Sequence, residues 1–311
     1  MTNPDRPTKA QRQNAAREKA RIMREEAKRK QRRNRFFLQG GIGLGILAVI
    51  VIAVVVIVNV SRPTSNAGPK NMKSDGIVLT STTEYVATPG IPHGGKPTPT
   101  TQPDDGRAHI TIYEDLQCPV CQAFEESNDS QIAQWLDAGS ATLEIHPISL
   151  PNLDAASQGN HYSSRAASAI GCVAQYSPSK FFAVNKAFYD NQPEEGGTGK
   201  TDAEIISTIK KGGASSSAIS SCVKDTRFKG WVQAASDRAL NGTSIPNSSI
   251  KQIQGTPTII VNGKEFQPPQ TQAGWGDTAA FLSFVKSTVP GWSPDGSGSG
   301  STPTPSPTTA G

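Results

Sequence analysis

The chain has few of the side chains that bind soft metal ions. It contains four histidines and three methionines, and every methionine precedes residue 73. A copper carrier would more often show methionine or histidine ligands near its thiols. A zinc site needs four ligands, usually as two close pairs, and the histidines show no matching spacing. The composition therefore disfavours a metal-binding function, and an anchored metal carrier or binding module stays only as an alternative.

Charge is absent from residues 36–60, which are largely aliphatic. A helix of this length, at about 1.5 Å per residue, can cross a hydrocarbon core of about 30 Å. A cleaved signal peptide would have a shorter apolar region followed by a small-residue cleavage site. Asn59-Val60-Ser61-Arg62 is a poor site. We therefore predict an uncleaved transmembrane helix over residues 36–60.

Acidic residues are scarce in residues 1–35, which hold 13 Lys and Arg but only 4 Asp and Glu. Subtracting these from the totals of 31 and 26 leaves 18 basic and 22 acidic residues in the remainder, a net charge of −4. A basic flank before an apolar span stays in the cytoplasm. Residues 1–35 could also bind nucleic acid or anionic lipid. We interpret them as a cytoplasmic arm, with the remainder extracytoplasmic and without a nucleic-acid partner.

Cysteine is absent from the arm and the span, and all four cysteines lie on the predicted outer side: Cys118, Cys121, Cys172 and Cys222. Disulfides persist outside the cytoplasm. An even number of cysteines confined to that side therefore favours thiol chemistry.

The two ends of the outer part have few apolar residues. Residues 61–107 are rich in Pro, Gly and Thr and are predicted to form a linker with one or two short strands near Ile77–Leu79. Residues 291–311 are predicted to be a disordered tail, because its small and polar residues cannot bury apolar surface. One globular domain, residues 108–290, remains.

Within this domain the pattern predicts an α/β fold. A strand ending near Tyr113 leads into a helix that Asn128-Asp129-Ser130 is predicted to kink or restart. A second strand, a helical block over residues 154–240 and a final helix follow. Before that last helix, Asn262-Gly263 lies between two strand-like runs, a strong hairpin signal.

The segment Cys118-Pro119-Val120-Cys121 carries the chemistry. At the start of a helix, the dipole and the unpaired N–H groups favour a thiolate at the first cysteine. Pro119 suits the first turn of the helix, and Cys121, one turn inside, suits the resolving role. A purely structural bridge across two residues would stabilise little, because the stabilisation grows with loop size.

Three segments in this order resemble the DsbA-type oxidoreductases of the thioredoxin superfamily, especially membrane-anchored actinobacterial members. The resemblance spans Ile110 to Val285 and implies a thioredoxin-like fold with an inserted helical domain. The segments are Tyr113–Glu125 (YEDLQCPVCQAFE), Phe181–Pro193 (FFAVNKAFYDNQP) and Gly255–Gly263 (GTPTIIVNG).

The resemblance implies roles for single residues. Cys118 is similar to the nucleophile of the family and Cys121 to its resolving cysteine. Pro257 matches a cis-proline that would present the backbone of Thr256 to an extended substrate. Glu125 resembles an acidic residue that relays the proton of Cys121, although an ordinary surface glutamate is the alternative.

One position departs from the family pattern. Many oxidising members carry His immediately before the second cysteine, where this chain has Val120. A cationic His would stabilise the thiolate, so its absence predicts a less oxidising pair than in the strongest oxidants.

The resemblance also implies that Cys172 and Cys222 bridge two helices, with a second redox relay as the alternative. It implies an oxidase that introduces disulfides into reduced exported polypeptides, is recharged by a quinone-linked membrane partner and holds no cofactor. A disulfide reductase or isomerase of the same fold stays open.

Overall fold

The computed structural model describes Glu18, Arg21, Met23, Lys28–Lys30 and residues 65–271 and 274–298. The chain divides into two units, Met1–Pro63 and Thr64–Gly311. In the first unit the described residues are helical and exposed. The predicted span over residues 36–60 lies outside the described residues. Within the described part, no helix has the length and apolar character needed to cross a membrane.

The second unit is built around a mixed five-stranded sheet of order β1-β3-β2-β4-β5. Its strands are β1 (Ile77–Leu79), β2 (Ala108–Glu114), β3 (Ala141–Pro147), β4 (Thr258–Val261) and β5 (Lys264–Glu265). β2 and β3 are parallel, and β1, β4 and β5 join antiparallel to their neighbours. The predicted Asn262-Gly263 hairpin is confirmed, with both turn residues at positive φ.

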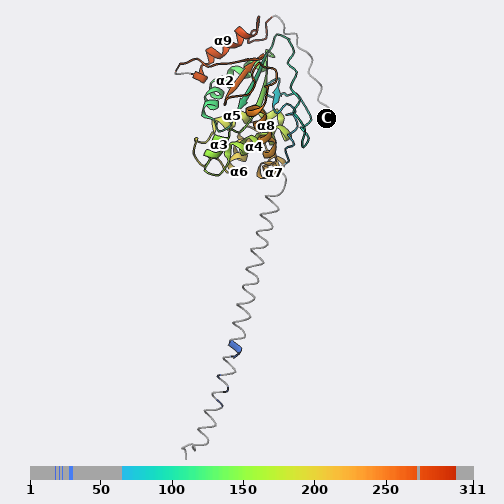
Figure 1. Ribbon diagram of the computed structural model, residues 1–311. Coiled ribbons are helices and arrows are strands. Elements are labelled where there is room, and N and C mark those ends of the chain that lie inside the picture. Colours follow the sequence, from blue (N-terminus) through green and yellow to red (C-terminus); the bar gives the residue numbers. More distant parts are fainter. Residues whose placement is uncertain are drawn as a thin grey trace, which may run out of the picture. The chain divides into compact units, whose positions relative to one another are not determined.

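Helices flank this sheet (Figure 1). α2 (Pro119–Asp137) connects β2 to β3, and α9 (Thr278–Thr288), preceded by the short helix η2 (Gly274–Gly276), follows the hairpin. The predicted helical block is an insertion between β3 and β4. It contains α3 (Pro151–Ala156), α4 (Tyr162–Tyr176), η1 (Pro178–Lys180), α5 (Phe181–Asp190), α6 (Asp202–Lys211), α7 (Ser217–Lys224) and α8 (Lys229–Asn241).

The predicted restart of α2 at Asn128-Asp129-Ser130 is wrong, because the helix is continuous from Pro119 to Asp137. Asn128 is fully buried, and its side-chain amide donates to the Phe124 carbonyl, one turn back, at 2.9 Å. A polar side chain that is satisfied in this way needs no helix end.

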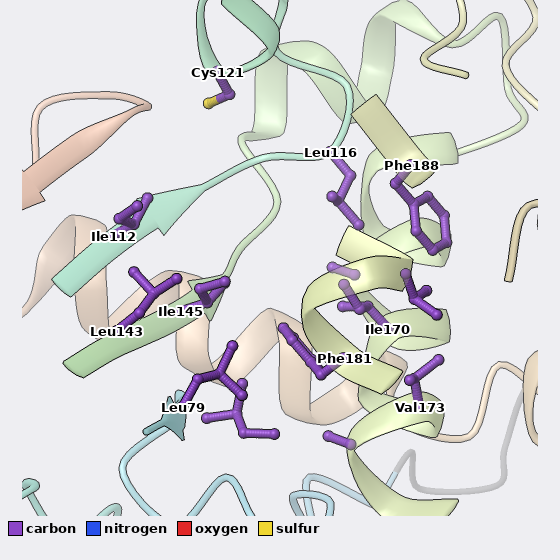
Figure 2. Packing of buried hydrophobic residues seen from close by; sticks show 14 of the residues in the cluster. Leu79, Ile112, Leu116, Cys121, Leu143, Ile145, Ile170, Val173, Phe181 and Phe188 are labelled. Carbon is purple, nitrogen blue, oxygen red and sulfur yellow. The ribbon is translucent and has the colours of Figure 1, made fainter. Parts of the chain in front are cut away.

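The helical insertion packs against the sheet through apolar side chains. Ile112 and Ile145 are directly opposite each other on the parallel pair β2 and β3. Figure 2 shows these strand residues and Phe181 and Phe188 of α5, which belong to the same cluster of buried side chains. Both phenylalanines are fully buried. Both of these side chains of α5 therefore belong to the hydrophobic core.

The segment before β2 differs from the predicted linker, because its described part packs against the domain. Met72 and Ile77 are fully buried. The Asp75 carboxylate accepts hydrogen bonds from Trp231 Nε1 at 2.9 Å and from Arg238 Nε and Nη2, both at 2.7 Å. Apolar anchors and this ion pair hold the segment to α8.

The described part of the predicted tail, residues 291–298, also packs against the domain. Trp292 is buried, and its indole N–H donates to the Ser140 carbonyl at 2.8 Å. The Ser140 hydroxyl in turn donates to the Pro294 carbonyl at 2.9 Å. One buried aromatic residue thus holds residues 291–298 against the start of β3.

We expect Arg238→Ala to lower the free energy of unfolding by about 2–3 kcal/mol, because it leaves the Asp75 carboxylate largely buried without its cation. This loss is smaller than the roughly 3–5 kcal/mol that follows when one partner of a fully buried ion pair is removed, because the Arg238 side chain is 34% exposed. Urea denaturation measures the loss. Arg227→Ala removes the exposed pair with Asp225 and should cost less than about 1 kcal/mol. Equal losses in the two variants would contradict this assignment.

Candidate active site

Cys118 is the residue that caps the N-terminus of α2, in the loop that follows β2. Its backbone is extended, with φ −79° and ψ 118°, and Pro119 occupies the first turn. The Cys118 amide donates to the Asp115 carbonyl at 2.9 Å. The side chain is therefore held where the free N–H groups of α2 point, as the sequence predicted for the first cysteine.

Cys121 lies one turn inside α2. Both cysteines of the pair are free thiols; Cys118 is 6% exposed and Cys121 is 0% exposed. Both thiols are buried, and Cys118 alone of the two keeps a small exposed fraction.

The loop before β4 brings the predicted proline segment beside Cys118. The Thr256-Pro257 peptide bond is cis. The Cys118 thiol donates to the Thr256 carbonyl at 3.3 Å. Residues separated by 138 positions in the sequence therefore meet at the sulfur.

The surroundings of the two thiols give them opposite acidities. The hydrogen bond from the Cys121 thiol is the main cause that lowers the pKa of Cys118 to about 6, against burial, which would raise it. Hydrogen bonds from the Thr256 side chain and from the backbone N–H groups of Cys121 and Val120 lower it further. Burial, with the neighbouring Cys118, raises the pKa of Cys121 well above its ordinary value.

Thr256 has one group that can hydrogen-bond the Cys118 thiol and another that can hydrogen-bond the Cys118 thiolate. Its carbonyl accepts from the thiol, and a carbonyl cannot donate to a thiolate. Its hydroxyl is buried and has no other partner. The hydroxyl is thus the group of Thr256 that can donate once Cys118 has lost its proton.

Asp115 is a buried site residue to which the sequence interpretation gave no role. Its carboxylate accepts from the Ser163 hydroxyl at 2.6 Å, from the Leu150 amide at 2.8 Å and from the Gln117 amide at 2.9 Å. Burial raises its pKa to about 7, and the nearby Cys118 adds to the rise. Asp115 thereby fixes the loop that carries Cys118 against the helical insertion.

Three further carboxyl groups are buried together between β2, α2 and α5. Glu114 is 0%, Glu125 4% and Asp129 6% exposed. Burial is the main cause that raises all three pKa values, that of Glu114 to about 7. The interpretation of Glu125 as a surface glutamate is therefore wrong. The alternation of side-chain directions along β2 could have placed Glu114 on the inner face of the sheet. Nothing in the sequence indicated that its carboxyl group lies near those of Glu125 and Asp129.

The second pair, Cys172 and Cys222, forms a disulfide between α4 and α7 with Cα atoms 5.9 Å apart. Both residues are fully buried. Neither sulfur is open to a substrate, which suits a structural bridge. Among residues 65–271 and 274–298, no group of three or more His, Cys, Asp or Glu side chains could hold a metal ion.

We expect the rate of alkylation at Cys118 to rise with a midpoint near pH 6. Its pKa is lowered in the folded protein, so the thiolate dominates above that pH and is lost as the pH falls through about 6. Cys121 should stay unmodified at neutral pH because it is buried as a neutral thiol. Iodoacetamide labelling, read by mass spectrometry, measures both. A midpoint near pH 8.5, that of a free cysteine, would contradict the account of the site.

Comparisons with known proteins agree with this geometry. The family model described as Thioredoxin matches residues 104–278, more than half of the chain. No curated protein matches significantly. Reduced DsbA from Mycobacterium tuberculosis is 24% identical with a TM-score of 0.50, covering 71% of this chain and 95% of that chain.

Two other solved structures are of the same kind. The oxidised form of the mycobacterial DsbA is 26% identical with a TM-score of 0.49, covering 69% of this chain and 92% of that chain. MdbA, a thiol-disulfide oxidoreductase from Corynebacterium diphtheriae, is 16% identical with a TM-score of 0.45, covering 74% of this chain and 98% of that chain. The predicted resemblance to a DsbA-type protein is confirmed for the fold by the reduced mycobacterial DsbA. With its mixed sheet and strand-to-helix cysteine pair, the chain belongs to the thioredoxin family.

Proposed function

We propose that this chain is a thiol–disulfide oxidoreductase that forms disulfide bonds in exported polypeptides. The observation that carries the proposal is the contrast between the two thiols. Cys118 keeps a small exposed fraction and has a lowered pKa, whereas Cys121 is fully buried and has a raised pKa. An oxidoreductase needs one sulfur that substrates can attack. It also needs a second, buried sulfur that breaks and re-forms the disulfide bond with the first.

The reaction follows from these two sulfurs. In the oxidised enzyme, a substrate thiolate attacks Cys118 Sγ, the Cys118–Cys121 bond breaks, and Cys121 leaves and takes up a proton. A second substrate thiolate then attacks the substrate sulfur of the mixed disulfide. Cys118 leaves as a thiolate, which its lowered pKa favours. Two substrate thiols have become one disulfide, and the enzyme has gained two electrons.

The Thr256 backbone supports recognition of an unfolded polypeptide. Its carbonyl is 3.3 Å from Cys118 Sγ, so a substrate segment bonded to that sulfur would lie beside it. Backbone pairing of this kind selects for extended chains without reading their side chains. A broad range of exported polypeptides fits such a site.

The lowered pKa of Cys118 also favours oxidation over reduction. Stabilising the thiolate stabilises the reduced enzyme, which makes the disulfide form a better oxidant. Val120 contributes a backbone N–H but no cation, and its side chain is 40% exposed. We infer an oxidase of intermediate strength rather than a reductase or isomerase.

We propose that the domain works outside the cytoplasm, anchored by residues 36–60, with residues 1–35 inside. The uncharged stretch and its basic flank support the anchor. The Cys172–Cys222 disulfide supports an oxidising compartment. The quinone-linked membrane partner that would reoxidise Cys118 and Cys121 rests on the DsbA resemblance.

Oxidative refolding tests the proposal. The full chain with its Cys118–Cys121 pair oxidised is mixed with a reduced, unfolded secreted ribonuclease, and the return of ribonuclease activity is followed. We expect faster disulfide formation than in air alone, with one substrate disulfide formed for each enzyme pair reduced. If the chain only reduced or reshuffled preformed substrate disulfides, the oxidase assignment would fail.

A further inference from the structure

The loop between β2 and α2, residues 115–118, is held by the helical insertion at each of its four positions. The Asp115 carboxylate accepts from the Ser163 hydroxyl at 2.6 Å. The Gln117 side-chain oxygen accepts from the Ser157 hydroxyl at 2.9 Å. The other two residues of the loop are bound through their carbonyl oxygens. The insertion therefore fixes the backbone that leads to the first cysteine.

Gln192, which follows α5, binds those two carbonyl groups. Its side-chain nitrogen donates to the carbonyl oxygens of Leu116 and Cys118, both at 3.1 Å. A glutamine amide has two N–H donors, so one side chain can serve both oxygens at once. Gln192 is itself tied to α5, because its backbone N–H donates to the Tyr189 carbonyl at 3.0 Å. It thus connects the end of α5 to the backbone of Cys118.

The Cys118 carbonyl governs how the sulfur lies against α2. It accepts the first hydrogen bond of the helix, from the Gln122 N–H at 3.1 Å. Its direction is set by the ψ angle of Cys118, which is 118°. In this extended conformation the side chain of a capping residue lies near the free N–H groups of the first turn. A second donor to the same carbonyl restricts rotation of this peptide group and keeps the sulfur near those N–H groups, which favour a thiolate.

A second glutamine side chain crosses from α2 to α5 at a different place. The Gln122 side-chain nitrogen donates to the Tyr189 carbonyl at 3.0 Å and to Oε1 of Glu126 at 2.9 Å. These acceptors belong to α5 and α2 and not to the loop. The two glutamines therefore separate the docking of α5 on α2 from the fixing of Cys118.

We propose that Gln192 is a positioning residue for disulfide exchange, because it holds the Cys118 backbone in the orientation that keeps the sulfur at the N-terminus of α2. It acts through the Cys118 carbonyl and not on the sulfur itself. The inference rests on the proposed function and deepens it, since it identifies what the helical insertion contributes to the nucleophile.

The pH profile of alkylation at Cys118 tests this role. The full chain, with Cys118 and Cys121 reduced and Cys172–Cys222 intact, is labelled with iodoacetamide from pH 5 to 9 and analysed by mass spectrometry. Gln192→Met keeps the side-chain length but removes both N–H donors. We expect its midpoint to rise by about 0.5 to 1 pH unit, an effect on the order of one hydrogen bond.

This rise has a definite sign at each pH. The wild-type midpoint lies near pH 6, so the higher midpoint lowers the thiolate fraction and the rate at pH 6 by about two- to fivefold. At pH 9 both proteins are thiolates, and their rates should agree within about twofold. Cys121 and Asp115, two titratable groups near Cys118, are unchanged in the variant.

Gln192→Met should also be a weaker oxidant. Ionisation of Cys118 stabilises the reduced pair. A higher midpoint therefore moves the equilibrium with glutathione at pH 7 about two- to fivefold toward the Cys118–Cys121 disulfide. The fraction of oxidised pair in glutathione buffers of known ratio measures this change.

Gln122→Met is the matched control, because it removes hydrogen bonds across the same contact between α2 and α5. Its alkylation midpoint should match that of the wild type. Gln192→Asn keeps an amide that is too short to reach both carbonyl groups, so its midpoint should rise as in Gln192→Met. It tests the same role in case the methionine variant does not fold.

Unchanged midpoints in the Gln192 variants would refute the positioning role, and so would an equal rise in Gln122→Met. These measurements need no substrate. Failure of the proposed function would show separately, as a wild-type chain that does not oxidise the reduced ribonuclease.

Discussion

Cys118→Ser is expected to abolish disulfide exchange, lowering the rate of oxidative refolding by at least ~10³-fold, because removal of a nucleophile leaves no covalent route. Cys121→Ser should behave differently. Its Cys118 still attacks a substrate disulfide, but no second sulfur resolves the product, so a mixed disulfide with substrate accumulates.

Non-reducing gel electrophoresis distinguishes these results, with the trapped complex released by dithiothreitol. Ala123→Ser, on the exposed side of α2, is the matched control and should keep nearly full activity. Adducts forming on Cys121 in the Cys118→Ser variant, at the wild-type rate, would reverse the assigned roles of the two sulfurs.

Loss of the second disulfide should have the largest effect on stability. The loop between Cys172 and Cys222 spans 50 residues, for which the chain-entropy relation gives about 4 kcal/mol. We expect Cys172→Ala/Cys222→Ala to lower the melting temperature by about 8–16 °C, using roughly 2–4 °C per kcal/mol for a domain of this size.

Differential scanning calorimetry measures this shift. The double variant Cys118→Ser/Cys121→Ser, which removes the other pair, is the control and should melt far closer to the wild type. The double alanine variant should keep exchange activity below its melting point, since Cys118 and Cys121 are intact. A shift under about 2 °C would mean that the bridge contributes little to stability.

Local patterns predicted the parts of the fold whose residues are close in sequence. The strand-to-helix junction at Cys118 and the hairpin at Asn262-Gly263 depend on short-range periodicity and turn chemistry, so they could be read directly. The contact between Cys118 and Thr256 came from the family resemblance, because no local pattern joins residues 138 positions apart.

The features that the sequence did not predict depend on the burial of polar residues or of single apolar residues. Glu114, Asp115 and Asp129 carry charges that normally mark a surface, and only the packing of the helical insertion against β2, α2 and the loop between them shows them to be internal. Asp75 and Trp292 each anchor a segment of otherwise low apolar content. One such residue changes a predicted linker or tail into part of the domain, which composition averaged over the segment cannot show.

The reduction potential of the Cys118–Cys121 pair tests the central claim most directly. The full chain is equilibrated with reduced and oxidised glutathione at pH 7, and the fraction of oxidised pair is counted with Cys172–Cys222 intact. The stabilised Cys118 thiolate and the absence of a cation at Val120 predict a potential between about −230 mV and that of the strongest oxidants, near −120 mV. A potential near −270 mV, that of thioredoxin, would contradict the assignment as an oxidase.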